Sequence, residues 1–169
     1  KVSGGKAKVA VLEGIPGHET GDSRLRGFRD AVGAHPGMTI VASQPANWER
    51  DQGFTVAQNM LQAHPETDAL FACSDLMALG ALEAIAAAGR SARIRVVGFD
   101  ALEDARKAID AGRMEASVAQ SPRGSRKTLL LGHGDEHSHQ VKSIHRLFLR
   151  VERSIPLYAY SSFHRNWAN

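Results

Sequence analysis

The sequence predicts a three-layer α/β fold built around a parallel sheet, and three observations lead to this prediction. Short apolar runs typical of buried strands alternate with segments that carry apolar residues at helical spacing, from residue 8 to residue 119. The links between these segments are short, as they are where helical crossovers join parallel strands. The composition, 43% hydrophobic and 23% charged residues, is typical of a globular domain.

Nine segments follow one another in this alternation, beginning with a strand. The expected strands are residues 8–12, 38–43, 69–73, 94–99 and 114–119. The expected helices are residues 22–34, 54–61, 75–89 and 102–111. Right-handed crossovers place such helices on both faces of the sheet, which makes the expected architecture Rossmann-like.

The ends of the expected helices carry residues that usually stop or cap a helix. The sequence 35–37, His-Pro-Gly, ends the first helix, and Pro65 closes the second. Ser74 is a good N-cap for the third helix, because its hydroxyl oxygen accepts hydrogen bonds from free backbone N–H groups. Gly89 is a usual stop at the end of that helix.

The formal net charge of +3 belongs to the last quarter of the chain. Residues 1–125 carry 14 lysines and arginines against 15 acidic residues, whereas residues 126–169 carry 7 against 3. A surface that reads phosphates normally needs a concentrated basic stripe, so the near-neutral body argues against nucleic acid as a partner. The single Cys73 excludes an internal disulfide framework.

Residues 126–169 differ from the body, and we expect a domain of residues 1–125 followed by an atypical, His-rich basic tail. Within the tail, residues 129–134 (LLLGHG) resemble one truncated helical turn. Its candidate metal ligands are His133, His137 and His139, because histidines four apart on one helix face bind zinc or nickel. The competing interpretation, which the neighbouring glycines favour, is a flexible, solvated segment without metal.

Polar side chains follow each expected strand, and ligands of parallel α/β sheets bind beyond the carboxyl ends of the strands. The candidate binding residues are Arg24, Trp48, Ser74, Asp75, Asp100 and Gln120. The set lacks a nucleophile with an adjacent base, so we expect neither an enzyme nor a cofactor. It suits a polyhydroxylated ligand, since carboxylates accept from hydroxyls, Arg and amides donate, and an aromatic ring covers C–H surface.

Each candidate also has a structural interpretation. Ser74 and Asp75 are at about even odds of being simple helix caps. Trp48 is also explained by surface packing, and Arg24 by a solvated helix charge.

Five segments resemble the periplasmic ribose-binding proteins, the sugar receptors of ABC importers. They are residues 42–48 (ASQPANW), 58–65 (QNMLQAHP), 75–82 (DLMALGAL), 96–100 (VVGFD) and 116–122 (ASVAQSP). The resemblance covers roughly residues 5 to 123, in order and nearly without gaps. It implies one lobe of a type I periplasmic binding protein, a family with two similar α/β lobes that close on one sugar.

The resemblance also implies roles for single residues. Arg24 matches the sugar-binding Arg ahead of Gly-Phe, and Trp48 matches an aromatic clamp that is more often Phe. Asp100 and Gln120 match the Asp and Gln that close their motifs. Ser74 stands where ribose receptors carry Asn, so the resemblance implies the broader class of a pentose, hexose or similar polyol.

The matched part corresponds to the second lobe only, so we expect a truncated receptor that binds sugar no more tightly than about millimolar. A full-length receptor would act in the periplasm and meet the membrane subunits of an ABC importer. The exposed cleft face makes a homodimer an open alternative. The competing function is the effector domain of a LacI-type regulator, which shares the fold but carries a helix-turn-helix that is absent from this sequence.

Overall fold

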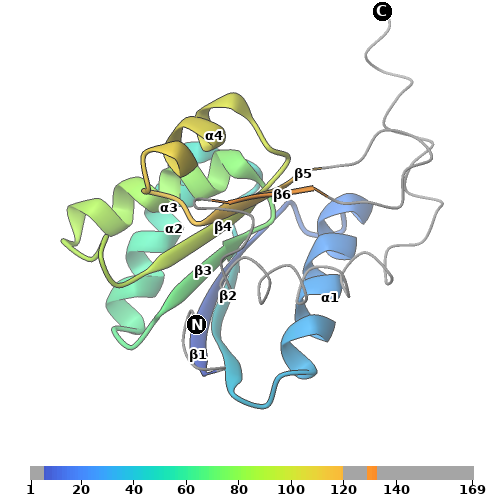
Figure 1. The fold of residues 1–169 in the computed structure, drawn as a ribbon. Coiled ribbons are helices and arrows are strands. Elements are labelled where there is room, and N and C mark those ends of the chain that lie inside the picture. Colours follow the sequence, from blue (N-terminus) through green and yellow to red (C-terminus); the bar gives the residue numbers. More distant parts are fainter. Residues whose placement is uncertain (1–5, 120–128, 133–169) are drawn as a thin grey trace, which may run out of the picture.

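A computed structural model of the chain describes residues 6–119 and 129–132, which form six strands and four helices (Figure 1). The strands are β1 (Ala7–Glu13), β2 (Met38–Pro45), β3 (Ala69–Ala72), β4 (Arg95–Phe99), β5 (Ala116–Ala119) and β6 (Leu129–Gly132). The helices are α1 (Glu19–Gly33), α2 (Arg50–Ala63), α3 (Asp75–Ala87) and α4 (Glu103–Asp110). The predicted α/β alternation is therefore confirmed.

The strands form one sheet in the order β2-β1-β3-β4-β5-β6. Strands β1 to β5 are parallel, as the sequence predicts, and β6 runs antiparallel to β5. The prediction of a helical turn at residues 129–134 is wrong for residues 129–132, because Leu129 to Gly132 pair with the outer edge of β5. Backbone groups at that edge offer hydrogen bonds that a single isolated turn does not supply.

Helices cover both faces of the sheet. Helix α1 lies on one face, and α2, α3 and α4 lie on the other (Figure 1). On the α1 face, the ring of Phe28 stacks on that of Phe71 from β3, with 4.2 Å between ring centroids. On the other face, α3 is apolar almost all round and packs closely against α2, where a Cβ at Gly80 would overlap the backbone oxygen of Arg50.

Helices α1 and α2 begin earlier than the periodicity predicts. Helix α1 begins at Glu19 and α2 at Arg50, three and four residues before the expected starts at 22 and 54. The first turns carry polar and acidic residues such as Glu19 and Asp51, which favour a helix N-terminus but add nothing to the apolar pattern. Ser74 is the N-cap of α3, and its Oγ accepts a hydrogen bond from the backbone N–H of Met77.

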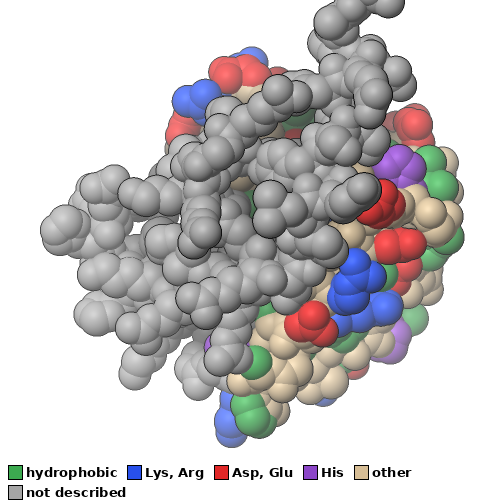
Figure 2. Space-filling view, turned by 90° about the vertical axis from the view of Figure 1, so that its right-hand side faces the viewer, with side chains coloured by type: hydrophobic (Ala, Val, Ile, Leu, Met, Phe, Trp, Pro, Cys, Tyr) green, Lys and Arg blue, Asp and Glu red, His purple; other side chains and the backbone are tan. Residues whose placement is uncertain are grey.

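The face of the molecule that carries α1 is turned toward the viewer in Figure 2. Basic and acidic side chains lie next to one another in the part of this face that the structure describes. The exposed positions of α1 reflect this mixture, with Asp22 and Asp30 beside Arg26 and Arg29. No helix within residues 6–119 is both long and apolar enough to cross a membrane.

Candidate functional site

The loops that follow the parallel strands gather at one end of the sheet, around the point where the strand order reverses. The order β2-β1-β3 means that the chain leaves β1 toward one side and returns to β3 on the other. Ligands of open α/β sheets bind at this kind of switch point. Helix α1 follows β1 there, and Arg24 in its second turn extends over the ends of β3 and β4.

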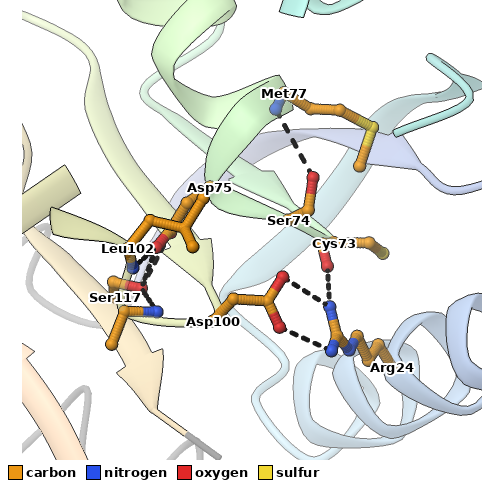
Figure 3. Close-up of polar contacts among 9 residues, drawn as sticks. Arg24, Cys73, Ser74, Asp75, Met77, Asp100, Leu102 and Ser117 are labelled. Atoms are coloured by element: carbon orange, nitrogen blue, oxygen red, sulfur yellow. Dashed lines mark hydrogen bonds and ion pairs between the residues drawn. The ribbon is translucent and has the colours of Figure 1, made fainter. Parts of the chain in front are cut away.

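The guanidinium of Arg24 is held by three hydrogen bonds (Figure 3). Its Nη1 donates to the carbonyl oxygen of Cys73 at 2.6 Å and to Oδ2 of Asp100 at 3.2 Å. Its Nη2 donates to Oδ1 of Asp100 at 2.7 Å. The Arg24 side chain is 7% exposed, whereas that of Asp100 is 28% exposed, so the carboxylate is the more accessible half of the pair.

Two aromatic rings surround this ion pair. The Cζ atom of Arg24 lies 4.1 Å from the ring centroid of Phe99 and 5.7 Å from that of Trp48. Both distances fall within the range of cation–π attraction. The ring of His18 meets Trp48 edge-on, with centroids 5.9 Å apart. The structure thus combines a charged pair with aromatic surface at the switch point.

Two glycines make room for the Trp48 ring. A Cβ at Gly14 would overlap Cζ2 of Trp48, and a Cβ at Gly21 would lie 2.9 Å from the same atom. Trp48 also has a φ of 68°, a left-handed backbone conformation that bulky residues rarely adopt. The indole is therefore fixed both by its strained backbone and by the space that the two glycines leave.

The loop after β4 is strained as well, and three consecutive backbone N–H groups hold it in place. Asp100 and Ala101 have φ values of 109° and 54°. The N–H of Asp100 donates to the carbonyl oxygen of Val118 at 2.9 Å, and that of Ala101 to Oγ of Ser117 at 3.0 Å. The N–H of Leu102 donates to Oδ2 of Asp75 at 2.8 Å. Backbone strain of this kind persists where the surroundings hold it, and it clusters at functional sites.

Asp75 and Ser74 are placed differently from Arg24 and Asp100. The Asp75 side chain is completely buried and accepts from Ser117 Oγ and the Leu102 N–H beneath the loop. Ser74 is 5% exposed and caps α3, as its structural interpretation predicts. Asp75 therefore faces the protein interior, and a ligand at the rim reaches it only through the loop that it holds.

Burial changes the acidity of two groups below the rim. Desolvation raises the pKa of Asp75 to about 6, although the hydrogen bonds from Ser117 and Leu102 act in the opposite direction. Desolvation also raises the pKa of the Cys73 thiol to about 12, against a smaller lowering by the nearby charge of Arg24. The thiol is thus protonated at neutral pH and does not act as a nucleophile.

Of the predicted residues, the structure brings Arg24, Trp48 and Asp100 together, with Ser74 and Asp75 in the layer below. Gln120 and the tail histidines lie outside the described residues. Sequence reasoning missed Phe99 and Ser117, because both stand within expected strands and the candidates were taken from the loops that follow the strands. A hydroxyl inside the apolar strand 116–119 was the available signal for Ser117, because buried polar groups need partners.

The chain matches the model of a known family. The family model described as "Periplasmic binding protein domain" matches residues 1–129 of the chain. The chain belongs to this family. The resemblance to periplasmic binding proteins inferred from five short segments is therefore confirmed, and so is the α/β fold class.

Curated relatives of this periplasmic binding protein domain include a ribose-binding and an allose-binding protein. It is 47% identical to the ribose import binding protein of Escherichia coli K12 over 122 residues, which is 72% of this chain and 40% of that protein. It is 41% identical to the D-allose-binding periplasmic protein of the same organism, over 68% of this chain and 37% of that protein. The chain thus spans about two fifths of the length of these relatives.

Solved structures of the family agree with the observed fold. An ABC transporter periplasmic solute binding protein from Actinobacillus succinogenes, solved with bound D-allose, matches with a TM-score of 0.69 and 33% identity, over 90% of this chain and 50% of that one. The Caulobacter myo-inositol binding protein, bound to myo-inositol, matches with a TM-score of 0.68 and 40% identity, over 71% of this chain and 42% of that one.

Proposed function

We propose that this periplasmic binding protein domain forms one wall of a carbohydrate site in the receptor of an ABC importer. The ligand is a pentose, hexose or cyclic polyol. The observation that carries the proposal is the Asp100 carboxylate, held at two points by Arg24 and still partly exposed, with the Trp48 ring 5.7 Å from the same guanidinium. The relatives named above are transport receptors, which favours a receptor over a LacI-type regulator.

In this proposal each residue has a distinct role. Asp100 accepts hydrogen bonds from neighbouring sugar hydroxyls, and Arg24 orients that carboxylate while donating to the same hydroxyls or to a ring oxygen. Trp48 covers the C–H face of the sugar ring. Gln120, which follows β5 in the sequence, adds an amide, and the Ser74 hydroxyl, which caps α3, donates to a ligand oxygen.

Exposed apolar side chains around the site support a surface for a protein partner. Among the described residues, the exposed large apolar side chains are Ile15, Leu76 and Leu102. They follow β1, begin α3 and follow β4, so all three belong to the end of the sheet that carries the site. This placement supports a second protein wall across the ligand. The proposed receptor works in the periplasm with the membrane subunits of an importer. A homodimer through the same face is the alternative occupant.

The proposal is tested by following Trp48 fluorescence in a Trp167→Phe background, which leaves a single tryptophan. D-ribose, D-allose and myo-inositol are added up to about 100 mM, a range that detects affinities near millimolar. We expect a saturable change with at least one of them. Asp100→Asn removes the change, whereas Asp104→Asn, at an exposed position of α4, leaves it intact. Saturation that survives Asp100→Asn would contradict the proposed site.

A further inference from the structure

A buried polar pair lies directly beneath the loop that carries Asp100 (Figure 3). Asp75, the first residue of α3, and Ser117, in the middle of β5, are both completely buried. The hydroxyl of Ser117 lies 2.7 Å and 2.9 Å from the two carboxylate oxygens of Asp75. We call these two residues the Asp75–Ser117 pair.

The pair binds the backbone of the strained loop at two consecutive positions. Ser117 Oγ accepts from the N–H of Ala101, and Asp75 Oδ2 accepts from the N–H of Leu102. Asp100 and Ala101 both have positive φ values, a conformation that non-glycine residues adopt only where their surroundings hold it. The pair therefore supplies two of the three hydrogen bonds that fix the backbone carrying the Asp100 side chain.

The neighbouring strand leaves space for the carboxylate of the pair. A Cβ at Gly98 would overlap Oδ1 of Asp75 and would come within 2.6 Å of Cε of Met114. Only a residue without a side chain lets the carboxylate approach β4 this closely. Three different elements thus meet below the loop: β4 leaves the space at Gly98, β5 supplies the Ser117 hydroxyl and α3 supplies the Asp75 carboxylate.

We propose that Asp75 and Ser117 are positioning residues, which hold the 100–102 loop so that Asp100 faces Arg24 and the ligand. The proposal rests on the proposed function for its ligand. It also replaces the sequence-based expectation that Asp75 contacts the sugar itself. Neither side chain of the pair is exposed, so the pair acts on the ligand through the backbone of Asp100 to Leu102.

One hydrogen bond between the pair and the loop also depends on pH. Burial raises the pKa of Asp75 to about 6, and the charged groups that act on it are Asp100, which raises this pKa, and Arg24, which lowers it. A protonated carboxyl group has one hydroxyl oxygen that donates, so it is a weaker acceptor for Leu102 and Ser117. The hydrogen bond from the Leu102 N–H to Asp75 therefore weakens as the pH falls below about 6.

The experiment compares the full chain with Ser117→Ala, Asp75→Asn and the conservative variant Ser117→Thr, which keeps the hydroxyl. Amide hydrogen exchange reports on the loop at Ala101 and Leu102, with amides of β1 as the internal standard for global stability. The resolved guanidinium N–H signals of Arg24 report, without any sugar, on its two-point contact with Asp100. D-allose titrations then report on the ligand.

In Ser117→Ala we expect exchange at Ala101 and Leu102 to accelerate about tenfold, the effect of losing roughly one hydrogen bond, with β1 unchanged. The Arg24 signals broaden, the affinity for D-allose falls by a similar factor, and Ser117→Thr restores all three. In the unmodified chain the Leu102 amide shift titrates with a midpoint near pH 6, and in Asp75→Asn this titration disappears.

Unchanged exchange at Ala101 and Leu102 in Ser117→Ala would overturn the proposal, because the pair would then not hold the loop. Faster exchange with unchanged Arg24 signals would overturn it too, because Asp100 would keep its place without the pair. A chain that binds no polyol at all refutes the proposed function instead, while the exchange and Arg24 signals still decide the role of the pair.

Discussion

Arg24 and Asp100 are 76 residues apart in the sequence, and yet the two side chains meet in a two-point ion pair with N–O distances of 2.7 Å and 3.2 Å. The guanidinium lies almost completely inside the protein, so this carboxylate and the carbonyl oxygen of Cys73 compensate its buried positive charge. A buried charge that loses its partner is strongly unfavourable. The free energy of unfolding of the domain therefore depends on the contact between Arg24 and Asp100.

Arg24→Lys tests this link. An ammonium group does not reproduce the planar contact with both oxygens of Asp100, so we expect the free energy of unfolding to fall by about 1–3 kcal/mol. Urea unfolding followed by circular dichroism measures the change. Arg26→Lys, at an exposed position of the same helix, is the control and changes stability by less than about 0.5 kcal/mol. Equal effects of the two substitutions would contradict the importance of the ion pair.

Gly14→Ala tests the space that holds the Trp48 ring. The added methyl group overlaps the indole, so we expect a loss of about 1–3 kcal/mol of stability and a shift in tryptophan emission as the ring moves toward solvent. Gly33→Ala, at the exposed end of α1, is the control, because nothing lies within 4 Å of its new methyl group. An unchanged emission spectrum in Gly14→Ala would show that the indole is not confined by Gly14.

Ala101→Gly tests the strain in the loop after β4. Ala101 has a φ of 54°, and a left-handed backbone costs an L-residue about 1–2 kcal/mol, of which glycine returns about half after its own entropy cost. We therefore expect calorimetry to show a higher melting temperature. Ala111→Gly, at the exposed C-cap of α4 with a φ of −78°, should lower the melting temperature instead. A decrease in both variants would argue against strain at Ala101.

Asp75 predicts a specific dependence of stability on pH. Its folded pKa of about 6 lies above the usual value for Asp, so between about pH 4 and pH 6 the folded protein binds more protons than the unfolded chain. Stability contributed by Asp75 therefore falls as the pH rises through this window, by up to about 3 kcal/mol.

The measurement compares the free energy of unfolding of the unmodified chain and of Asp75→Asn at several pH values. The contributions of other carboxylates cancel in this difference. The free energy of unfolding of the unmodified chain therefore falls relative to that of the variant as the pH rises from 4 to 6. A difference that stays constant over this range would show that Asp75 titrates normally. A difference that changes in the opposite direction would indicate a stabilising ionised carboxylate.

The single thiol gives a simple test of the core. Because Cys73 is fully buried and its pKa is raised to about 12, we expect thiol reagents at pH 8 to leave the native protein unlabelled. The same reagent in unfolding concentrations of urea labels one thiol per chain, which provides the control. Rapid labelling of the native protein would show that the end of β3 opens readily.

The sequence predicted the alternation of strands and helices because both periods are local properties of the chain. It also predicted which residues stand at the carboxyl ends of the strands, and hence that Arg24, Trp48 and Asp100 lie near one another. It was wrong at residues 129–132, where a run of three leucines followed by Gly132 carries no period and pairing with β5 decides the conformation. The boundary at residue 125, Gln120 and the tail histidines stay predictions.

Position in a loop was determined by the sequence, but the direction of each side chain was decided only by the tertiary structure. Asp75 and Asp100 are both carboxylates that follow a strand. Asp75 is buried beneath the 100–102 loop, whereas Asp100 belongs to that loop and is partly exposed. The physical reason is that long-range partners set these directions: Ser117 and the space at Gly98 draw Asp75 inward, and Arg24 holds Asp100 at the rim.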